Sequence, residues 1–267
     1  IVDARLEDGS RVHVVLEPVA LNGPILTIRK FPDPITMDRL LEYGSVTREA
    51  ADLLKILAAA RYNIFVSGGT GAGKTTFLNA LSEFIPPEER VITIEDSAEL
   101  KLAHIENLVR LETRNANGEG QGAIGIGMLI RAALRMRPDR IVIGEVRGQE
   151  AVDLLQAMNT GHDGSFCTGH ANSCRDMLAR LETMVLMGME LPLPAIRSQI
   201  ASALDVMVHV ARMRNRSRKV TAIEEVVGIE NGEIVLRPLF SLDGEGELRK
   251  AGDLRCQEKL RRAGYGL

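Results

Sequence analysis

The sequence is poor in aromatic residues and cysteines, and it has no long apolar run. Tryptophan is absent from the 267 residues and aromatic side chains make up only 3% of them, which argues against a stacking platform for single-stranded nucleic acid. The three cysteines do not suggest a disulfide framework, so we expect a reducing, cytoplasmic compartment. No apolar stretch approaches the ~18 residues of a membrane span, and the start lacks the basic-then-apolar pattern of a secretory signal.

A large excess of one charge sign is also missing. The net charge is −3, which argues against a dedicated nucleic-acid binder. Hydrophobic residues make up 45% and charged residues 26%, as in an ordinary globular protein. A chain of this length can bury one large core with a smaller module beside it. Because the sequence begins at Ile1 instead of Met, we expect it to be part of a longer protein.

The first part of the chain has a strand pattern and then a helical one. Polar and apolar residues alternate before residue 35, and Asp8-Gly9 and Asn22-Gly23 are turn signals, which predicts two or three antiparallel strands. A stiff connector follows at residues 32–34, since each proline there fixes its own backbone torsion. Short helices are then expected over residues 37–43 and after a cap at Thr47.

Alternating apolar runs and helical patterns dominate the rest. Three apolar runs are typical of strands buried on both faces, and helical patterns separate them, which predicts a parallel sheet covered by helices. Beyond residue 204, strand patterns joined by turn signals predict an antiparallel extension. The parallel strands are expected at 64–66, 91–94 and 141–143, the helices near 74–83, 127–137 and 149–159, and the antiparallel strands at 205–211, 220–229 and 233–240. We therefore predict an α/β fold in four segments: the end of an N-terminal α/β module (1–35), a linker with helices (36–62), a core (63–240), and a tail with a short helix over 254–262 (241–267).

A glycine-rich segment follows the first core strand. Residues 68–75 match G-x-x-x-x-G-K-[ST] in full and lie between a strand and a helix, as a phosphate-binding loop must. Glycines let the backbone curl so that amides point at phosphate oxygens, and the helix start adds its positive dipole end. Lys74 is expected to reach the β- and γ-phosphates of ATP, and the Thr75 hydroxyl to hold Mg²⁺. The alternative is a chance glycine-rich turn. The predicted nucleotide-binding residues here are Gly68, Gly69, Thr70, Gly71, Ala72, Gly73, Lys74, Thr75 and Thr76.

Carboxylates follow two other core strands. Glu145 comes directly after the strand at 141–143, at the sheet edge where ligands of α/β folds bind, although Gly144 stands where many such enzymes have an aspartate. We expect Glu145 to orient the attacking water or the metal; the alternative is a solvated loop glutamate. Glu95, Asp96 and Glu99 follow the strand at 91–94 and would repel each other unless a cation or several N–H donors lay nearby; bound Mg²⁺ would relieve that repulsion. Their alternative interpretation is an acidic helix start.

Histidines, cysteines and arginines allow further interpretations. His170, after a short strand, could sense the γ-phosphate or be a structural hydrogen-bonding residue. A zinc site at Cys167, His170 and Cys174 with the nearby His162 is disfavoured, because the spacing is not a standard one. A basic run is either a solvated turn or a surface attracted to anionic lipid or an acidic partner. The run consists of Arg212, Arg214, Arg216, Arg218 and Lys219.

Taken together, these motifs resemble the type II/type IV secretion-system ATPases, and most closely the CpaF/TadA branch that powers Flp (tight-adherence) pilus assembly. The resemblance covers nearly the whole chain. Its blocks are the phosphate loop (68–76), an aspartate box (93–100), a Walker B block (135–148), a histidine box (164–173), and shorter matches at 8–11, 27–31, 109–114 and 156–162. Two cysteines depart from the family pattern: serine or threonine is expected in place of Cys167, and proline in place of Cys174.

The resemblance implies a RecA-like core and a homohexameric motor on the cytoplasmic side of the inner membrane, peripheral to it, working with membrane-embedded assembly or secretion proteins. From the net charge and the scarce aromatic residues, no direct contact to nucleic acid is expected. It implies Glu145, Glu99 and Glu95 as catalytic carboxylates and His170 as a sensor. Arginines would complete the site: Arg11 and Arg29 from the N-terminal module, and Arg110 and Arg114 near the ATP of a neighbouring subunit. Two rivals stay open: a type IV ATPase for DNA or protein transfer, and a scaffold that binds ATP with negligible turnover.

Overall fold

The computed structural model describes residues 1–30, 33–116 and 120–266, in two compact units, Ile1–Pro34 and Ile35–Leu267. Pro32, in the expected connector, lies outside the described residues. No helix in the described part of the chain is both long and apolar enough to cross a membrane.

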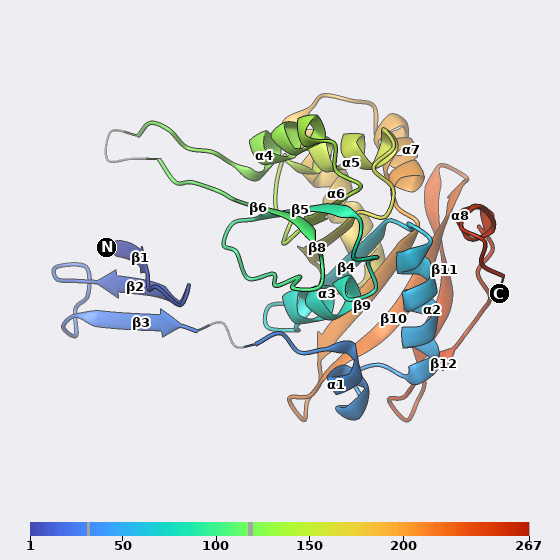
Figure 1. Cartoon of the computed structure of the whole chain (residues 1–267), viewed down its shortest axis with the longest axis horizontal. Coiled ribbons are helices and arrows are strands. Elements are labelled where there is room, and N and C mark those ends of the chain that lie inside the picture. Colours follow the sequence, from blue (N-terminus) through green and yellow to red (C-terminus); the bar gives the residue numbers. More distant parts are fainter. Residues whose placement is uncertain (31–32, 117–119, 267) are drawn as a thin grey trace. The chain divides into compact units, whose positions relative to one another are not determined.

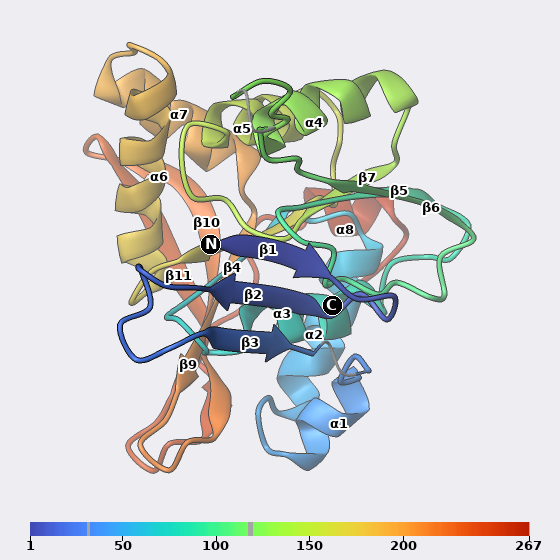
Figure 2. The same cartoon turned by 90° about the vertical axis from the view of Figure 1, so that its left-hand side faces the viewer.

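The first unit is a three-stranded antiparallel sheet (Figure 2). Its strands are β1 (Val2–Arg5), β2 (Arg11–Val15) and β3 (Ile25–Arg29). Between β1 and β2, the Asp8 carboxylate accepts a hydrogen bond from the Ser10 amide at 2.8 Å, and Gly9 has a φ of 84°. The turn signals and the antiparallel strands predicted from the sequence are confirmed.

The second unit is built on a nine-stranded sheet with the order β12-β11-β10-β9-β4-β8-β7-β5-β6. The strands from β9 to β6 are parallel, and β9 to β12 pair antiparallel. The parallel core and its antiparallel extension therefore agree with the predicted fold class. The strands are β4 (Ile64–Gly68), β5 (Arg90–Glu95), β6 (Asn107–Glu112), β7 (Arg140–Ile143), β8 (Phe166–His170), β9 (Val206–Arg212), β10 (Arg218–Glu230), β11 (Glu233–Leu242) and β12 (Leu248–Lys250).

Helices cover both faces of this sheet (Figure 1). Side chains alternate across β4: Ile64 and Val66 pack in one core cluster with α2 and α3, whereas Phe65 packs in the other with α4 to α7. Burial on both faces explains why β4, β5 and β7 are continuous apolar runs. The helices are α1 (Met37–Glu42), α2 (Arg48–Ala59), α3 (Lys74–Ser82), α4 (Ile126–Ala133), α5 (Ala151–Asn159), α6 (Cys174–Gly188), α7 (Leu193–Ala203) and α8 (Glu258–Arg262), with a 3₁₀ turn at Leu134–Met136.

The structure differs from the sequence prediction at three helices. The helix predicted over 127–137 ends as α4 at Ala133, and Arg137 is left-handed (φ 54°), because the residue before Pro138 is disfavoured in the α conformation. The helix predicted over 254–262 begins only at Glu258, because the Glu225 carboxylate accepts the amides of Arg255 and Cys256 in a segment without regular secondary structure. Thr47 precedes α2 as predicted, but its side chain makes no capping hydrogen bond.

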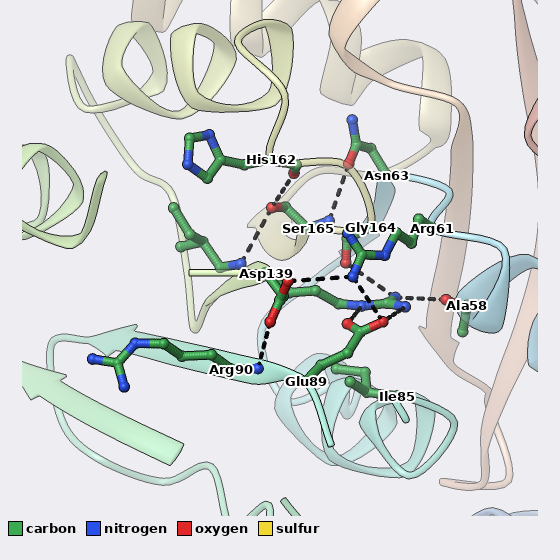
Figure 3. Close-up of polar contacts among 12 residues, drawn as sticks. Ala58, Arg61, Asn63, Ile85, Glu89, Arg90, Asp139, His162, Gly164 and Ser165 are labelled. Carbon is green, nitrogen blue, oxygen red and sulfur yellow. Dashed lines mark hydrogen bonds and ion pairs between the residues drawn. The ribbon is translucent and has the colours of Figure 1, made fainter. Parts of the chain in front are cut away.

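A buried charge cluster lies at the amino-terminal edge of the sheet (Figure 3). Arg140, the first residue of β7, is fully buried and donates to both carboxylate oxygens of Glu89 and, at 2.5 Å, to the Ala58 carbonyl. Arg61 lies 3.2 Å from Glu89 and 3.4 Å from Asp139. The cluster therefore joins the end of α2 to the loop before β5 and to the start of β7.

Candidate nucleotide site

The opposite, carboxyl-terminal edge of the sheet gathers the segments that carry the sequence motifs. Gly68, the last residue of β4, pairs with His170 of β8. Ile143, at the end of β7, pairs with Cys167 of β8 on one side and with Ile94 of β5 on the other. The glycine loop, the histidine box, the Walker B block and the aspartate box therefore leave four neighbouring strands at one edge.

The glycine loop leads from β4 into α3. Gly73 precedes the helix with a φ of 95°, a left-handed conformation that glycine adopts without steric cost. In the described part of the chain, the amides of Gly71, Gly73 and Lys74 make no hydrogen bond to another protein group. Together with the start of α3, these amides form a site suited to an anion.

Lys74 lies inside this loop. The residue is 7% exposed, and its ammonium donates to the Gly69 carbonyl at 3.2 Å. Burial lowers the pKa of Lys74, and the nearby Glu145 carboxylate opposes that shift. The Lys74 ammonium is thus a cationic partner for an anion held by the loop amides.

Glu145 lies in a cluster of charged side chains. His170 contacts one of its carboxylate oxygens through Nδ1, and Arg147 donates to the other through Nε at 2.9 Å and Nη2 at 2.6 Å. Arg147 also lies 3.0 Å from Asp96, and its hydrogen bond to Glu145 raises its pKa. Because the Glu145 side chain is 15% exposed and has two charged or polar partners, the alternative of a solvated loop glutamate is wrong.

Arg147 was not among the predicted site residues. The sequence places it two positions after Glu145, where the Walker B block continues, but gives no sign that its side chain turns back and reaches Asp96. The contact depends on β5 and β7 being neighbours in the sheet. Arg147 therefore joins the Walker B block to the aspartate box.

Glu95 is buried beneath the aspartate box. One carboxylate oxygen accepts the amides of Glu99 at 2.9 Å and Leu100 at 3.0 Å, and the other is buried without a partner in the described part of the chain. Gly144 makes room for this side chain, since a Cβ there would lie 2.9 Å from the Glu95 Cγ. Residues 96–100 are not helical, so the alternative of an acidic helix start is wrong.

The burial of Glu95 predicts a pH dependence of stability. Burial raises its pKa from 4.5 to about 7, against the opposing effect of the two amide hydrogen bonds. Between these values the folded protein holds more protons than the unfolded chain, so the free energy of unfolding should fall as the pH rises. Glu95→Gln, which keeps an acceptor for both amides, should remove this slope and be more stable than the unsubstituted protein by up to a few kcal/mol above about pH 7.

Urea unfolding of both proteins between about pH 5 and about pH 8 measures this effect. Glu88→Gln, at an exposed carboxylate before β5, is the control and should leave the slope in place. An unchanged slope in Glu95→Gln would contradict the buried, proton-binding role of this carboxyl group.

The other predicted residues of the second unit lie in and beside the aspartate box. The Glu99 carboxylate is close enough to Glu95 to raise its pKa further. Arg110, on β6, donates to the Leu100 carbonyl at 3.1 Å, and Arg114 donates to the Gly122 carbonyl at 2.8 Å. Both arginines therefore hold loops of their own chain, and their proximity to a neighbour's ATP stays a prediction.

The predicted arginines of the first unit are cross-strand partners. Arg11 of β2 pairs with Arg29 of β3, and on its other side with Arg5 of β1. Directly paired residues point to the same face of a sheet, and like charges opposite each other are unfavourable. All three arginines are exposed. The pairing of Arg5 with Arg11 was not predicted, because strand register cannot be read from the sequence.

The arrangement fits a nucleotide with a magnesium ion. Loop amides without protein partners and the Lys74 ammonium suit phosphate groups. Thr75 lies in the first turn of α3, and Mg²⁺ at such sites needs only one or two protein ligands in addition to phosphates. Glu145 supplies a carboxylate near Lys74. The site is therefore equipped for phosphate binding and for water activation.

The fold is a RecA-like α/β fold, the class of many nucleotide-driven motors. A family model described as "Type II/IV secretion system protein" matches residues 1–238, and the chain belongs to this family.

Individual relatives are consistent with this family assignment. The chain is 46% identical over 215 residues to "Putative conjugal transfer protein Rv3659c" of Mycobacterium tuberculosis, covering 80% of this chain and 60% of that protein. It is 37% identical to the "Type IV secretion system protein PtlH" of Bordetella pertussis, and the match covers 79% of this chain and 70% of that protein. The crystal structure of the VirB11 ATPase from the Brucella suis type IV secretion system superposes on this chain with a TM-score of 0.60 at 32% sequence identity. The match covers 84% of this chain and 73% of that one. The chain thus spans about 60% of the length of the mycobacterial relative.

Proposed function

We propose that this chain is the ATPase of a secretion or pilus-assembly machine, binding Mg²⁺-ATP at residues 68–76 and hydrolysing it. The observation that carries the proposal is that the amides of Gly71, Gly73 and Lys74 have no protein partner in the described part of the chain. They lie in the loop that holds the Lys74 ammonium, at the sheet edge where Glu145 also lies. Membership of the type II/IV secretion family supports it.

The mechanism assigns a task to each group in the site. The loop amides and Lys74 bind the β- and γ-phosphates, and Glu145 orients water for in-line attack on the γ-phosphate. His170 and Arg147 fix the rotamer of Glu145 through its two carboxylate oxygens. Bound Mg²⁺, held by the Thr75 hydroxyl, would supply charge neutralisation on the phosphate oxygens.

The arginines complete this site in a ring of subunits. We propose a homohexamer in which Arg11, Arg29, Arg110 and Arg114 reach nucleotide, with Glu99 as a further carboxylate near the metal. Arginines placed in this way contribute about 10³- to 10⁵-fold in other nucleotide hydrolases. Movement of the first unit against the ring would be passed to membrane proteins of the machine, with the hexamer on the cytoplasmic face of the inner membrane.

This motor could drive either of two kinds of machine, a pilus-assembly system or a type IV transfer or secretion system. The motif blocks favour the CpaF/TadA branch and Flp-type pilus assembly. The names of the mycobacterial and Bordetella relatives favour transfer or secretion through a type IV system. Neighbouring genes for pilin and prepilin peptidase would support the first, and conjugation genes the second.

Replacing Lys74 with Ala tests the site assignment. The substitution removes the ammonium from the loop, so we expect phosphate release from ATP to fall by about 10²- to 10³-fold and ATP affinity to weaken. Lys55→Ala, at an exposed position of α2, is the matched control and should be neutral. Full activity of Lys74→Ala would refute the assignment.

The same assay separates a motor from a scaffold. For the unsubstituted protein, we expect repeated turnover at ATP concentrations that saturate binding. Tight binding with phosphate release below one equivalent would favour a nucleotide-binding scaffold.

A further inference from the structure

The hairpin between β9 and β10 contacts the glycine loop. Arg218, the first residue of β10, donates through Nε to the Gly71 carbonyl at 2.9 Å. Its aliphatic part runs past Gly73, where an added Cβ would lie 3.1 Å from the Arg218 Cδ. Arg218 belongs to the basic run interpreted above as a solvated turn or a lipid-facing surface. The residue is exposed, as a solvated turn predicts, but its guanidinium also contacts the glycine loop.

Strand pairing fixes the position of this hairpin. Gly68 pairs with Val210 on β9, so closely that a Cβ on Gly68 would collide with the Val210 carbonyl. On the next strand, Val220 pairs with Val210 and donates its amide to the Ser45 carbonyl at 2.8 Å. The start of β10 is therefore anchored to the element that carries the loop.

The glycine loop is held by two sets of contacts. From within, the Gly69 carbonyl accepts the Ala72 amide and the Lys74 ammonium, each at 3.2 Å. From the hairpin, Arg218 holds the carbonyl of the peptide that joins Gly71 to Ala72. Because a peptide unit is planar, fixing its carbonyl also fixes the direction of the Ala72 amide and of the chain that follows.

We propose that Arg218 is a positioning residue for the phosphate loop, holding it in the conformation that binds nucleotide. This inference rests on the proposed function of residues 68–76. A hydrogen bond from a charged donor is stronger than one between neutral groups, so a single guanidinium can restrict a loop that contains several glycines. Its positive charge also lies beside the place where the phosphates would bind.

Arg218→Met tests the proposal, since methionine keeps much of the aliphatic contact and loses both the donor and the charge. In the nucleotide-free protein, hydrogen–deuterium exchange of residues 69–75 should become faster. The Kd for a fluorescent ATP analogue should rise about 10-fold, the effect expected for loss of one charge-assisted hydrogen bond. Arg218→Lys should recover most of both effects, whereas a purely steric role would not be rescued by charge.

Arg214→Met is the matched control, because Arg214 is an exposed arginine of the same hairpin. It should change neither exchange nor Kd. An Arg218→Met protein with unchanged exchange and Kd would overturn the proposal, as would an equal loss in Arg214→Met, which would indicate a general charge effect. Lys74→Ala measured in parallel separates the two hypotheses: if it also binds the analogue normally, the proposed nucleotide site itself is wrong.

Discussion

Replacing Glu145 with Gln should lower the rate of ATP hydrolysis by about 10²- to 10⁴-fold, the range for loss of a general base or water-orienting carboxylate. The amide is nearly isosteric and keeps an oxygen to accept from Arg147, so the fold should be retained. Because Glu145 acts on water and Lys74 on the phosphates, the affinity for ATP should change little. Glu145→Gln should therefore bind and retain ATP, whereas Lys74→Ala should show both weaker ATP binding and slower turnover.

Single-turnover hydrolysis together with equilibrium binding measures this separation. Glu190→Gln, at an exposed carboxylate after α6, is the control and should leave both quantities unchanged. Hydrolysis by Glu145→Gln within a few-fold of the unsubstituted rate would show that another group activates the water. Glu99, the second predicted carboxylate, would then be the first to substitute.

Replacing Arg140 with Met should destabilise the fold by about 3–5 kcal/mol, the cost of leaving a buried charge without its partner. Arg140 is fully buried and Glu89 nearly so, and the guanidinium is also bonded to the Ala58 carbonyl (Figure 3). Its removal would leave the buried Glu89 carboxylate with the half-exposed Arg61 as its remaining cationic partner among the described residues.

Chemical unfolding of Arg140→Met measures the loss, with Arg135→Met, at an exposed position before β7, as the matched control. The double variant Arg140→Met/Glu89→Met should recover part of the stability, because two apolar side chains leave no unpaired charge. A single variant as stable as the control would show that the cluster contributes little to stability.

Patterns of neighbouring residues in the sequence predicted the elements whose structure depends mainly on those neighbouring residues. The runs that became β4, β5 and β7 are apolar because both faces are covered, and the glycine loop was found because its motif is continuous in sequence. Helices α6 and α7 were not predicted, although Ser173 before α6 caps the Asp176 amide and could have been found as a capping signal.

Contacts between distant segments could not be predicted from local patterns. The pairing of Arg147 with Asp96, the row of Arg5 with Arg11 and Arg29, and the contact of Arg218 with Gly71 each depend on which strands are neighbours and in which register. The burial of Glu95, at the end of β5, depends in addition on Gly144, which follows β7. Because Gly144 has no side chain, the Glu95 side chain has space there.

A crystal structure of the protein soaked with Mg²⁺ and a non-hydrolysable ATP analogue tests the central claim most directly. We expect the triphosphate within the loop at residues 68–75, Lys74 turned from the Gly69 carbonyl to the phosphates, and Glu145 facing the γ-phosphate. A nucleotide bound elsewhere, or a loop free of phosphate with Lys74 still on Gly69, would contradict the account.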